Sequence, residues 1–389
     1  MAKIQPEIEA FARIKVIGVG GSGTNAVNHM VNAKVRGVEF VAMNTDAQHL
    51  HASVSQKKVH IGKNLTRGLG TGMDPEIGRK AAEESLEDIQ NVIKGADMVF
   101  VSGGLGGGTG TGAMPVIART AKEQGALTVA VVTKPFIFEG KHRMALAERG
   151  MLELQKEVDA VIVIPNDRLL GIISKDTTAE HAFAMCDEIL RQAVEGISNI
   201  ITIPGIINVD FADIRAIMQN AGSALMGIGN ASGENRAVEA ARNAINSPLL
   251  DLSVDGAKGV LFTIAGGSDM TMFEIQEAAK VITESIDPDA KVIFGAIHDD
   301  KLKKSEIRVT VIACGFPESQ KKKGGLFGFD SNNKETEVAK ERSNGVPPST
   351  TLRQTPPRTQ VIEPENQSDG DDEDDWSSIP AFLRRGNKK

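Results

Sequence analysis

The stretch GGLGGGTGTG, residues 103–112, combines residues that can hold a phosphate. Seven of its ten residues are glycine, although glycine loses more backbone entropy on folding than any other residue. It follows an apolar run, residues 96–102, that is typical of a buried strand, and precedes residues 113–124, whose apolar spacing predicts a helix. Free N–H groups and the positive dipole end at such a helix start attract anions, and Thr109 and Thr111 add hydroxyl donors. The pattern predicts a phosphate loop and disfavours a flexible linker.

A second glycine cluster raises the question of which phosphate compound is bound. Gly18, Gly20 and Gly23 match G-x-G-x-x-G between a predicted strand and helix, as in dinucleotide-binding proteins. The acidic residue that binds the ribose in those proteins belongs at the end of the next strand, whereas Glu39 stands at its beginning and the strand ends in NTD, residues 44–46. The sequence has no G-x-x-x-x-G-K-[ST] motif, which excludes an ordinary P-loop enzyme. A nucleotide held by several loops fits best, with a nicotinamide-dependent oxidoreductase as the alternative.

Composition argues against several classes of partner. Aromatic residues make up 4% of the 389, with no Tyr and one Trp, which disfavours a base-stacking surface for single-stranded nucleic acid, and the net charge of −7 disfavours general DNA binding. Two cysteines give neither a disulfide framework nor a metal site and fit a reducing compartment. The N-terminus lacks a signal-peptide core, and no apolar run approaches the roughly 18 residues of a membrane span. We therefore expect a cytoplasmic protein with no nucleic acid partner and no direct membrane insertion.

The elements that must position these residues follow an alternating order. Apolar runs rich in Val and Ile alternate with helical segments, which predicts a parallel sheet covered on both faces. The expected fold class is α/β: a Rossmann-like, parallel-sheet domain over 13–178, a long connecting helix over 179–202, and a smaller α+β domain with a mixed sheet over 203–316. In the last of these we expect helices near 211–221 and 234–246, followed by strands that alternate between buried and exposed positions.

The ends of the chain differ in composition from the rest. Residues 1–12 are predicted to be a flexible leader, and residues 317–370, rich in polar and charged residues, a disordered linker. Residues 371–389 contain acidic residues, the apolar motif WSSIPAFL and a basic end. An apolar stripe in a polar tail is typical of a peptide that folds on a partner. The residues expected to contact that partner are Trp376, Ile379, Pro380, Phe382, Leu383 and Arg384.

Several motifs together carry a resemblance to a known family. GGLGGGTGTG is the signature of the phosphate loop of the tubulin superfamily, and with GVGGSGTNAV, KPFIFEGKHR, IPNDRLL, NVDFADIR and the tail WSSIPAFLRR it resembles the FtsZ family, the bacterial cell-division homologues of tubulin. The match runs in order over about 13–316 and again over 376–385. The resemblance implies a GTPase that binds GTP and GDP with Mg²⁺ and polymerises with copies of itself into filaments of the division ring at midcell.

The resemblance also implies which residues hold the nucleotide. Residues 21–25 would line the α- and β-phosphates and one side of the base, and residues 107–110 the β- and γ-phosphates. Residues 68–73 and Asp46 are placed to approach the γ-phosphate, and Mg²⁺ is expected to bind through phosphates and water, with no certain protein ligand. The implied nucleotide-binding residues are Gly20, Gly21, Ser22, Gly23, Thr24, Asn25, Asp46, Thr71, Gly72, Gly104, Gly107, Gly108, Thr109, Gly110, Glu139, Arg143, Asn166, Phe183 and Asp187.

Some of these roles compete with plainer explanations. Glu139 and Arg143, four apart on a helix, more often form a surface ion pair. By spacing alone, Phe183 suits a core position and Asp187 a polar face. The resemblance favours guanine recognition instead, with Phe183 stacked on the base and the Asp187 carboxylate accepting from N1–H and the 2-amino group, which adenine cannot supply. Asn166 follows a predicted strand, where doubly wound folds bind ligands.

The segment NVDFADIRAIM, residues 208–218, carries the residues expected to act in hydrolysis. Asp210 and Asp213 suit the N-cap and third position of a helix, which stabilises a helix by about 1 kcal/mol. Both lie beyond the connecting helix from the nucleotide. The resemblance implies that this loop enters the nucleotide site of the next subunit, where the two carboxylates polarise the attacking water and Asn208 contacts the nucleotide. Such a head-to-tail contact does not close and therefore builds filaments.

The resemblance further implies partners and turnover. The C-terminal peptide would bind membrane tethers of the FtsA kind and other division regulators. Hydrolysis would remove the γ-phosphate from the contact between subunits and let filaments disassemble. Two other functions stay open from the sequence: the oxidoreductase, and a nucleotide-binding scaffold that polymerises without turnover.

Overall fold

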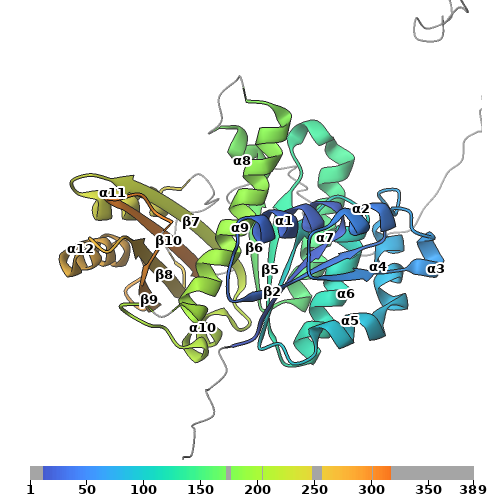
Figure 1. Ribbon diagram of the computed structural model, residues 1–389, viewed down its shortest axis with the longest axis horizontal. Helices are drawn as coiled ribbons and strands as arrows, with labels where there is room; N and C mark the ends of the chain where they lie inside the picture. Colours follow the sequence, from blue (N-terminus) through green and yellow to red (C-terminus); the bar gives the residue numbers. More distant parts are fainter. Residues whose placement is uncertain (1–11, 172–176, 204, 248–255, 300, 317–389) are drawn as a thin grey trace, which may run out of the picture. The chain divides into compact units, whose positions relative to one another are not determined.

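The computed structural model describes residues 12–171, 177–203, 205–247, 256–299 and 301–316. These residues form an α/β fold of helices packed on both faces of one central sheet (Figure 1). The expected fold class is confirmed. The predicted linker, the tail motif from Trp376 to Arg384, and all of the leader except its last residue lie outside the described residues.

The first six strands form the parallel part of the sheet, and each corresponds to a predicted apolar run. Their Val and Ile residues are buried almost without interruption, because helices cover both faces. All five pairings among them are parallel. The strands are β1 (Ile14–Val19), β2 (Val38–Asn44), β3 (Lys57–His60), β4 (Met98–Gly104), β5 (Leu127–Lys134) and β6 (Ala160–Pro165).

Two of the helices that connect these strands begin inside the glycine-rich stretches. One starts at Gly20, and another starts at Thr109 rather than at 113 as predicted, so glycines expected in loops lie in first helical turns. The elements are α1 (Gly20–Asn32), α2 (Ala47–Ala52), α3 (Lys63–Thr66), α4 (Pro75–Glu84), α5 (Leu86–Ile93), α6 (Thr109–Glu123), the 3₁₀ turn η1 (Ile137–Glu139), α7 (Lys141–Glu157), α8 (Asn166–Leu170) and the long α9 (Ala179–Thr202).

Two separate cores lie on the two faces of the parallel strands. Alternate residues of a strand point to opposite faces, so neighbours in sequence enter different cores. Val16 and Phe100 pack with α1 and α9, whereas Ile17 and Val101 pack with α5, α6 and α7. The long helix α9 is therefore part of the core, as its apolar spacing predicts.

The second half of the chain extends the same sheet. Its elements are α10 (Phe211–Met218), β7 (Gly222–Ser232), α11 (Arg236–Ile245), β8 (Gly259–Gly266), α12 (Met272–Thr283), β9 (Lys291–His298) and β10 (Glu306–Cys314). The full strand order is β3-β2-β1-β4-β5-β6-β7-β10-β8-β9. Strand β7 pairs in parallel with β6 and antiparallel with β10, so it joins the two halves of the chain into one sheet.

Strand β7 was not predicted from the sequence, and the helix before it ends at Met218, three residues before the predicted end at 221. The strand reads GSALMGIGNAS, and its glycines and scarcity of β-branched residues disfavour a strand by propensity. Packing explains one of these glycines, because a Cβ on Gly229 would lie 2.0 Å from the carbonyl oxygen of Ala240 in α11. The expected alternation is also wrong for β8, whose eight residues are all buried because helices cover both of its faces.

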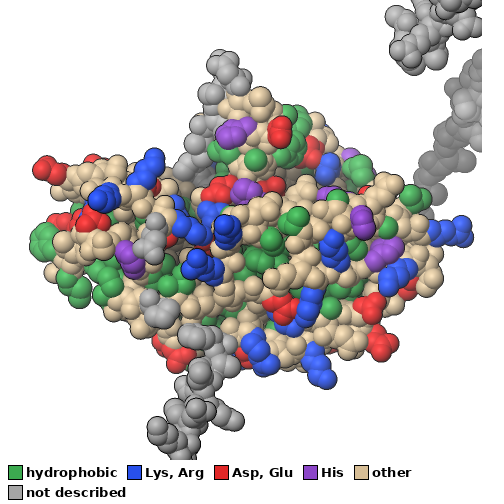
Figure 2. Space-filling model, viewed as in Figure 1, with side chains coloured by type: hydrophobic (Ala, Val, Ile, Leu, Met, Phe, Trp, Pro, Cys, Tyr) green, Lys and Arg blue, Asp and Glu red, His purple; other side chains and the backbone are tan. Residues whose placement is uncertain are grey.

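Large apolar side chains remain exposed in two parts of the chain. Leu69, Ile137 and Phe138, in the connections near the carboxyl ends of the parallel strands, are each more than half exposed. In the second half, the same holds for Ile206, and for Met272 and Phe273 at the start of α12. Figure 2 shows apolar side chains at the surface over α12 and β9.

Glycine is required where the phosphate loop packs against its neighbours. A Cβ on Gly108 would lie 2.0 Å from Thr71 Oγ1 and 2.8 Å from the backbone of Asp74, and a Cβ on Gly78 would lie 2.4 Å from the carbonyl oxygen of Gly108. Gly107 differs, because no described atom outside its immediate chain neighbours lies within 4 Å of an added Cβ. The loop is thus tightly packed at one glycine and open at the next.

This contrast gives a paired prediction. Gly108→Ala is expected to destabilise the protein by about 1–3 kcal/mol, because its methyl group overlaps Thr71. Gly107→Ala is expected to change the free energy of unfolding by less than about 0.5 kcal/mol, since its methyl group meets only open space. Urea denaturation of both variants measures the two values. Equal stability of the two variants would show that the loop is not packed as described.

Candidate functional site

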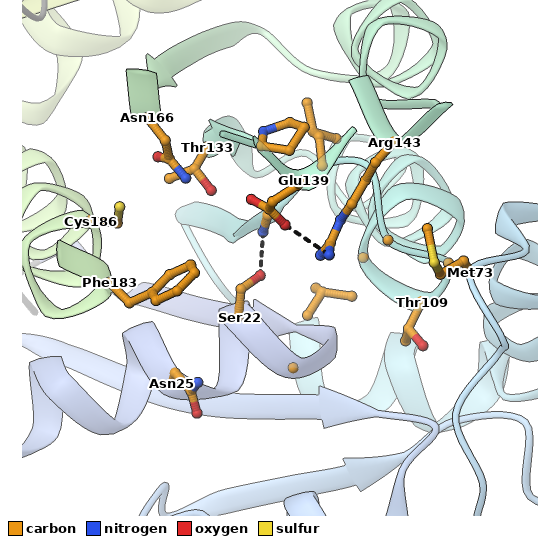
Figure 3. Close-up of a pocket in the computed structure, with 18 of the residues that line it drawn as sticks. Ser22, Asn25, Met73, Thr109, Thr133, Glu139, Arg143, Asn166, Phe183 and Cys186 are labelled. Carbon is orange, nitrogen blue, oxygen red and sulfur yellow. Dashed lines mark hydrogen bonds and ion pairs between the residues drawn. The ribbon is translucent and has the colours of Figure 1, made fainter. Parts of the chain in front are cut away.

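A pocket of about 330 Å³ opens at the carboxyl ends of β1, β4, β5 and β6 (Figure 3). This is the edge where parallel α/β sheets bind ligands. Most of the residues named from the sequence line this pocket, although they come from six separate segments of the chain. Those residues are Gly21, Ser22, Asn25, Thr71, Gly72, Gly104, Gly107, Gly108, Thr109, Gly110, Glu139, Arg143, Asn166, Phe183 and Asp187.

Four of the expected residues do not line the pocket. Gly20 and Gly23 lie behind it, where the backbones of α1 and its neighbours approach too closely for a side chain. The Thr24 hydroxyl donates to the carbonyl of Gly20 inside α1, at 2.8 Å. The Asp46 carboxylate accepts from the backbone N–H of His49 at 3.0 Å and caps α2. These four residues therefore stabilise the elements around the pocket and do not line it.

Two helices start at this pocket without a side-chain cap. The N-cap positions of α1 and α6 are Val19 and Gly108, and neither makes a side-chain hydrogen bond to its helix. The first turns of a helix carry N–H groups with no partner inside the helix, and the dipole adds positive potential. Two uncapped helix starts facing one cavity make a site for a ligand with several negative charges.

Hydroxyl groups gather between these helix starts. Thr109 Oγ1 lies 2.8 Å from Thr45 Oγ1 and 3.4 Å from Thr71 Oγ1. The Ser22 hydroxyl accepts from the backbone N–H of Gly104 at 2.6 Å, which ties α1 to the end of β4. Thr111, expected as a donor to phosphate, is buried and accepts from a loop N–H at 2.9 Å, so it stabilises the loop instead.

The other end of the pocket is formed by α9 and the end of β6. Phe183 is half exposed and meets Phe136 edge-on, with ring centroids 5.5 Å apart. Asn166 is buried, and its Oδ1 has no hydrogen-bond partner among the described residues. Burial raises the pKa of Asp187 to about 6. A flat ring, an unsatisfied amide oxygen and a desolvated carboxylate suit a planar ligand with hydrogen-bond donors.

Glu139 and Arg143 form an ion pair of 2.8 Å, and both also line the pocket. The ion pair expected from their spacing and the pocket location expected from the resemblance are therefore compatible. Five lining residues were not predicted: Val19, Thr133, Pro135, Cys186 and Leu190. Met73 and Leu105 also line the pocket and belong to loops that were predicted to approach the phosphates. Thr133 could have been found, because it ends a predicted strand at the ligand edge. Burial raises the pKa of the Cys186 thiol to about 12, so this thiol is not a nucleophile at neutral pH.

The segment 208–218, which carries the carboxylates expected to act in hydrolysis, lies away from this pocket. Asn208, Asp210 and Asp213 are exposed and none of them lines the pocket. Asp210 caps α10 by accepting from the N–H of Ala212 at 3.0 Å, which agrees with the capping explanation. This segment follows the end of α9, whose 24 residues span about 36 Å, whereas the pocket lies near its start. Figure 1 shows α8 and α10 at opposite ends of α9.

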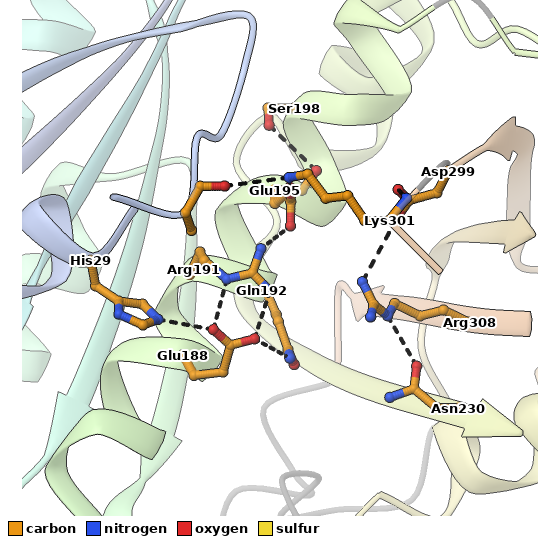
Figure 4. Close-up of polar contacts among 11 residues, drawn as sticks. His29, Glu188, Arg191, Gln192, Glu195, Ser198, Asn230, Asp299, Lys301 and Arg308 are labelled. Carbon is orange, nitrogen blue, oxygen red and sulfur yellow. Dashed lines mark hydrogen bonds and ion pairs between the residues drawn. The ribbon is translucent and has the colours of Figure 1, made fainter. Parts of the chain in front are cut away.

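A chain of ion pairs links α9 to both neighbouring parts of the fold (Figure 4). The buried Arg191 binds Glu188 at 2.6 Å and also pairs with Glu195. His29 of α1 contacts Glu188 at 2.9 Å, and Lys301, between β9 and β10, contacts Glu195 at 3.0 Å and a backbone carbonyl just after α1. Burial raises the pKa of Glu188, but hydrogen bonds from Arg191 and His29 outweigh it and bring the pKa to about 2.

The described part of the chain holds no group of three or more His, Cys, Asp or Glu side chains that could bind a metal ion. Within the same residues, no helix is both long and apolar enough to cross a membrane.

Comparison with known proteins agrees with this geometry. The model of the Tubulin/FtsZ family GTPase domain matches residues 13–174, and that of the FtsZ family C-terminal domain matches residues 222–317. An empty FtsZ dimer from M. jannaschii is 46% identical, with a TM-score of 0.76 over 79% of this chain and 89% of that one. A GTPγS-bound CetZ2 protofilament from Haloferax volcanii shares the fold at 21% identity, with a TM-score of 0.67 over 79% of this chain and 94% of that one.

The oxidoreductase alternative does not fit these findings. The two family models together cover all ten strands of the sheet and most of the segments that line the pocket, and the match to the M. jannaschii FtsZ covers most of both chains. The chain belongs to the FtsZ family: it is a tubulin-like GTPase that binds GTP and GDP and polymerises with copies of itself.

Proposed function

We propose that this GTPase hydrolyses GTP only where two subunits meet head to tail in a filament of the bacterial division ring. The observation that carries the proposal is the distance between two half-sites. One end of α9 bears a pocket with two uncapped helix starts, and the other end bears exposed carboxylates that cannot reach it in the same molecule. A second copy, stacked on the first, supplies the missing half.

In this mode the phosphates lie on the starts of α1 and α6, beside the hydroxyl groups of Ser22 and Thr109. The guanine lies against Phe183, and the Asp187 carboxylate accepts hydrogen bonds from its N1–H and 2-amino group. The unsatisfied Asn166 Oδ1 gains a donor from the ligand. Mg²⁺ is held by phosphate oxygens and water, which agrees with its tendency to keep several waters.

The subunit contact is supported by the exposed apolar side chains. Leu69, Ile137 and Phe138 belong to the half with the pocket, and Ile206 and Met272 to the half with the carboxylates. Exposed apolar patches mark protein interaction sites, and two different faces of one chain that fit each other produce an open filament.

Hydrolysis follows from this contact. Asp210 and Asp213 of one subunit polarise a water molecule next to the γ-phosphate on its neighbour, and Asn208 contacts the nucleotide. The water oxygen bonds to the γ-phosphorus, and the bond from phosphorus to the β–γ bridging oxygen breaks. GDP leaves with the electron pair of that bond, and the two protons of the water stay on the released phosphate. Loss of the γ-phosphate weakens the contact, so filaments turn over.

The cellular role is proposed from the family and the tail sequence. The filament assembles in the cytoplasm at midcell, and the C-terminal peptide around Trp376 and Phe382 recruits membrane tethers of the FtsA kind and other division regulators. An apolar motif after a polar linker suits such a contact, because the linker lets the peptide reach a partner.

The Asp187 role predicts a dependence of GTP affinity on pH. The carboxylate must be ionised to accept from guanine, and its pKa in the empty protein is about 6, so affinity is present above pH 6 and is lost as the pH falls. The dissociation constant for GTP is expected to rise about tenfold from pH 7 to pH 5. Calorimetry measures this dissociation constant at each pH. The Asp187→Asn variant is the control, because any pH dependence that remains in it comes from the titration of GTP itself. Equal pH profiles for both proteins would contradict this role.

Mixing two inactive variants tests the shared site. Gly107→Ala is expected to block phosphate binding and Asp213→Ala to remove the water-polarising group, so each alone loses most GTPase activity, by roughly 10²-fold or more for the second. In an equal mixture, one neighbour pairing in four has both intact halves, so about a quarter of the normal rate returns. Phosphate release measures the rate.

Co-sedimentation shows whether both variants enter the polymer. The matched control mixes Asp210→Ala with Asp213→Ala, which alter the same half-site and should not complement each other. If co-polymerised Gly107→Ala and Asp213→Ala stay as inactive as the control mixture, the site is not shared between subunits.

A further inference from the structure

His49 of α2 lies against the start of α1, although it does not line the pocket. A Cβ built on Gly21 would lie 3.8 Å from ring atoms Cε1 and Nδ1 of His49. Both ring nitrogens have partners: Nε2 lies 2.9 Å from Asn25 Oδ1, and Nδ1 lies 3.3 Å from Asn44 Nδ2. The imidazole therefore bridges two amide side chains, one buried at the end of β2 and one on the wall of the pocket.

The direction of these hydrogen bonds is set by the backbone. The N–H of Asp46 can only donate, and it donates to Asn44 Oδ1 at 3.3 Å. Asn44 therefore turns its NH₂ group toward His49, so Nδ1 of the ring accepts and the ring carries its proton on Nε2. Nε2–H then donates to Asn25 Oδ1. One backbone N–H thus determines the orientation of an amide three hydrogen bonds away.

The consequence appears at Asn25, which lines the pocket. Its oxygen is held by His49, so its NH₂ group is the part left for a ligand. The phosphates, the ribose ring oxygen and guanine N3, N7 and O6 are all acceptors, and a donor suits them. A reversed amide would place its oxygen lone pairs against these acceptors.

We propose that His49 is a positioning residue for nucleotide binding: through its hydrogen bond it fixes the Asn25 amide with its donor toward the nucleotide. The proposal rests on the binding of the nucleotide in the pocket, as proposed above, with Asn25, which lines this pocket, in contact with the nucleotide. His49 acts before the chemical step, so it affects how tightly the nucleotide binds and not how fast the bound nucleotide is hydrolysed.

The test compares three full-length variants, His49→Ala, His49→Gln and Asn25→Ala, with the unchanged protein. His49→Ala is expected to raise the dissociation constant for GDP and the KM for GTP about 3- to 10-fold, the effect of one neutral hydrogen bond, with kcat at saturating GTP unchanged within about 2-fold. His49→Gln is expected to restore most of the affinity, because one amide can accept from Asn44 and donate to Asn25. The matched control is His51→Ala, an exposed histidine on the same helix, which should bind GDP normally.

A double variant separates positioning from a general structural effect. If His49 acts through Asn25, His49→Ala has no further effect on GDP affinity in the Asn25→Ala background. Undiminished affinity in His49→Ala, an equal loss in both backgrounds, or no rescue by His49→Gln would each overturn the proposal. If Asn25→Ala itself binds GDP normally, the binding mode proposed above is wrong at this residue, which is a different result from failure of His49 alone.

Discussion

The meeting of two uncapped helix starts at one edge of a parallel sheet is the constraint on which the rest of the structure depends. Neither α1 nor α6 has a side chain to satisfy its first N–H groups, and an anionic ligand is the natural partner for both. The glycines follow from this demand. On one side, at Gly107, they leave the backbone of the loop open to the ligand. On the other side, Gly108 of the loop packs closely against Thr71, and Gly78 of α4 packs closely against Gly108.

The helix α9 connects this site to the second half of the fold. Its first turns carry Phe183 and Asp187 at the pocket, and its end leads to the exposed carboxylates of Asp210 and Asp213. Between them, Arg191 and its partners tie α9 to α1 and to the β9–β10 connection. Removing Arg191 would take away the cation that Glu188 and Glu195 share, which is costly at the buried Glu195, and would leave only His29 and Lys301 to pair with them. The two half-sites are therefore held apart at a fixed distance, and a neighbouring copy is needed to join them.

Local patterns in the sequence are sufficient to predict the parallel strands and the phosphate loop, because apolar runs and glycine junctions act over a few residues. They fail at β7, where the close approach of α11 requires glycine at position 229 although glycine opposes strand propensity. They also fail for side chains that reach the pocket from a distance. Cys186 and Leu190 line it only because α9 packs against the sheet, and His49 reaches Asn25 only because α2 folds beside α1. Such contacts depend on tertiary packing that no short window contains.

The most direct measurement is the rate of GTP hydrolysis per molecule as a function of protein concentration, with light scattering recorded in the same sample and Mg²⁺ present. If the active site forms between subunits, both signals stay near zero at low concentration and rise together above one threshold. A constant rate per molecule at every concentration, with no change in scattering, would show that each molecule hydrolyses GTP alone and would contradict the shared site.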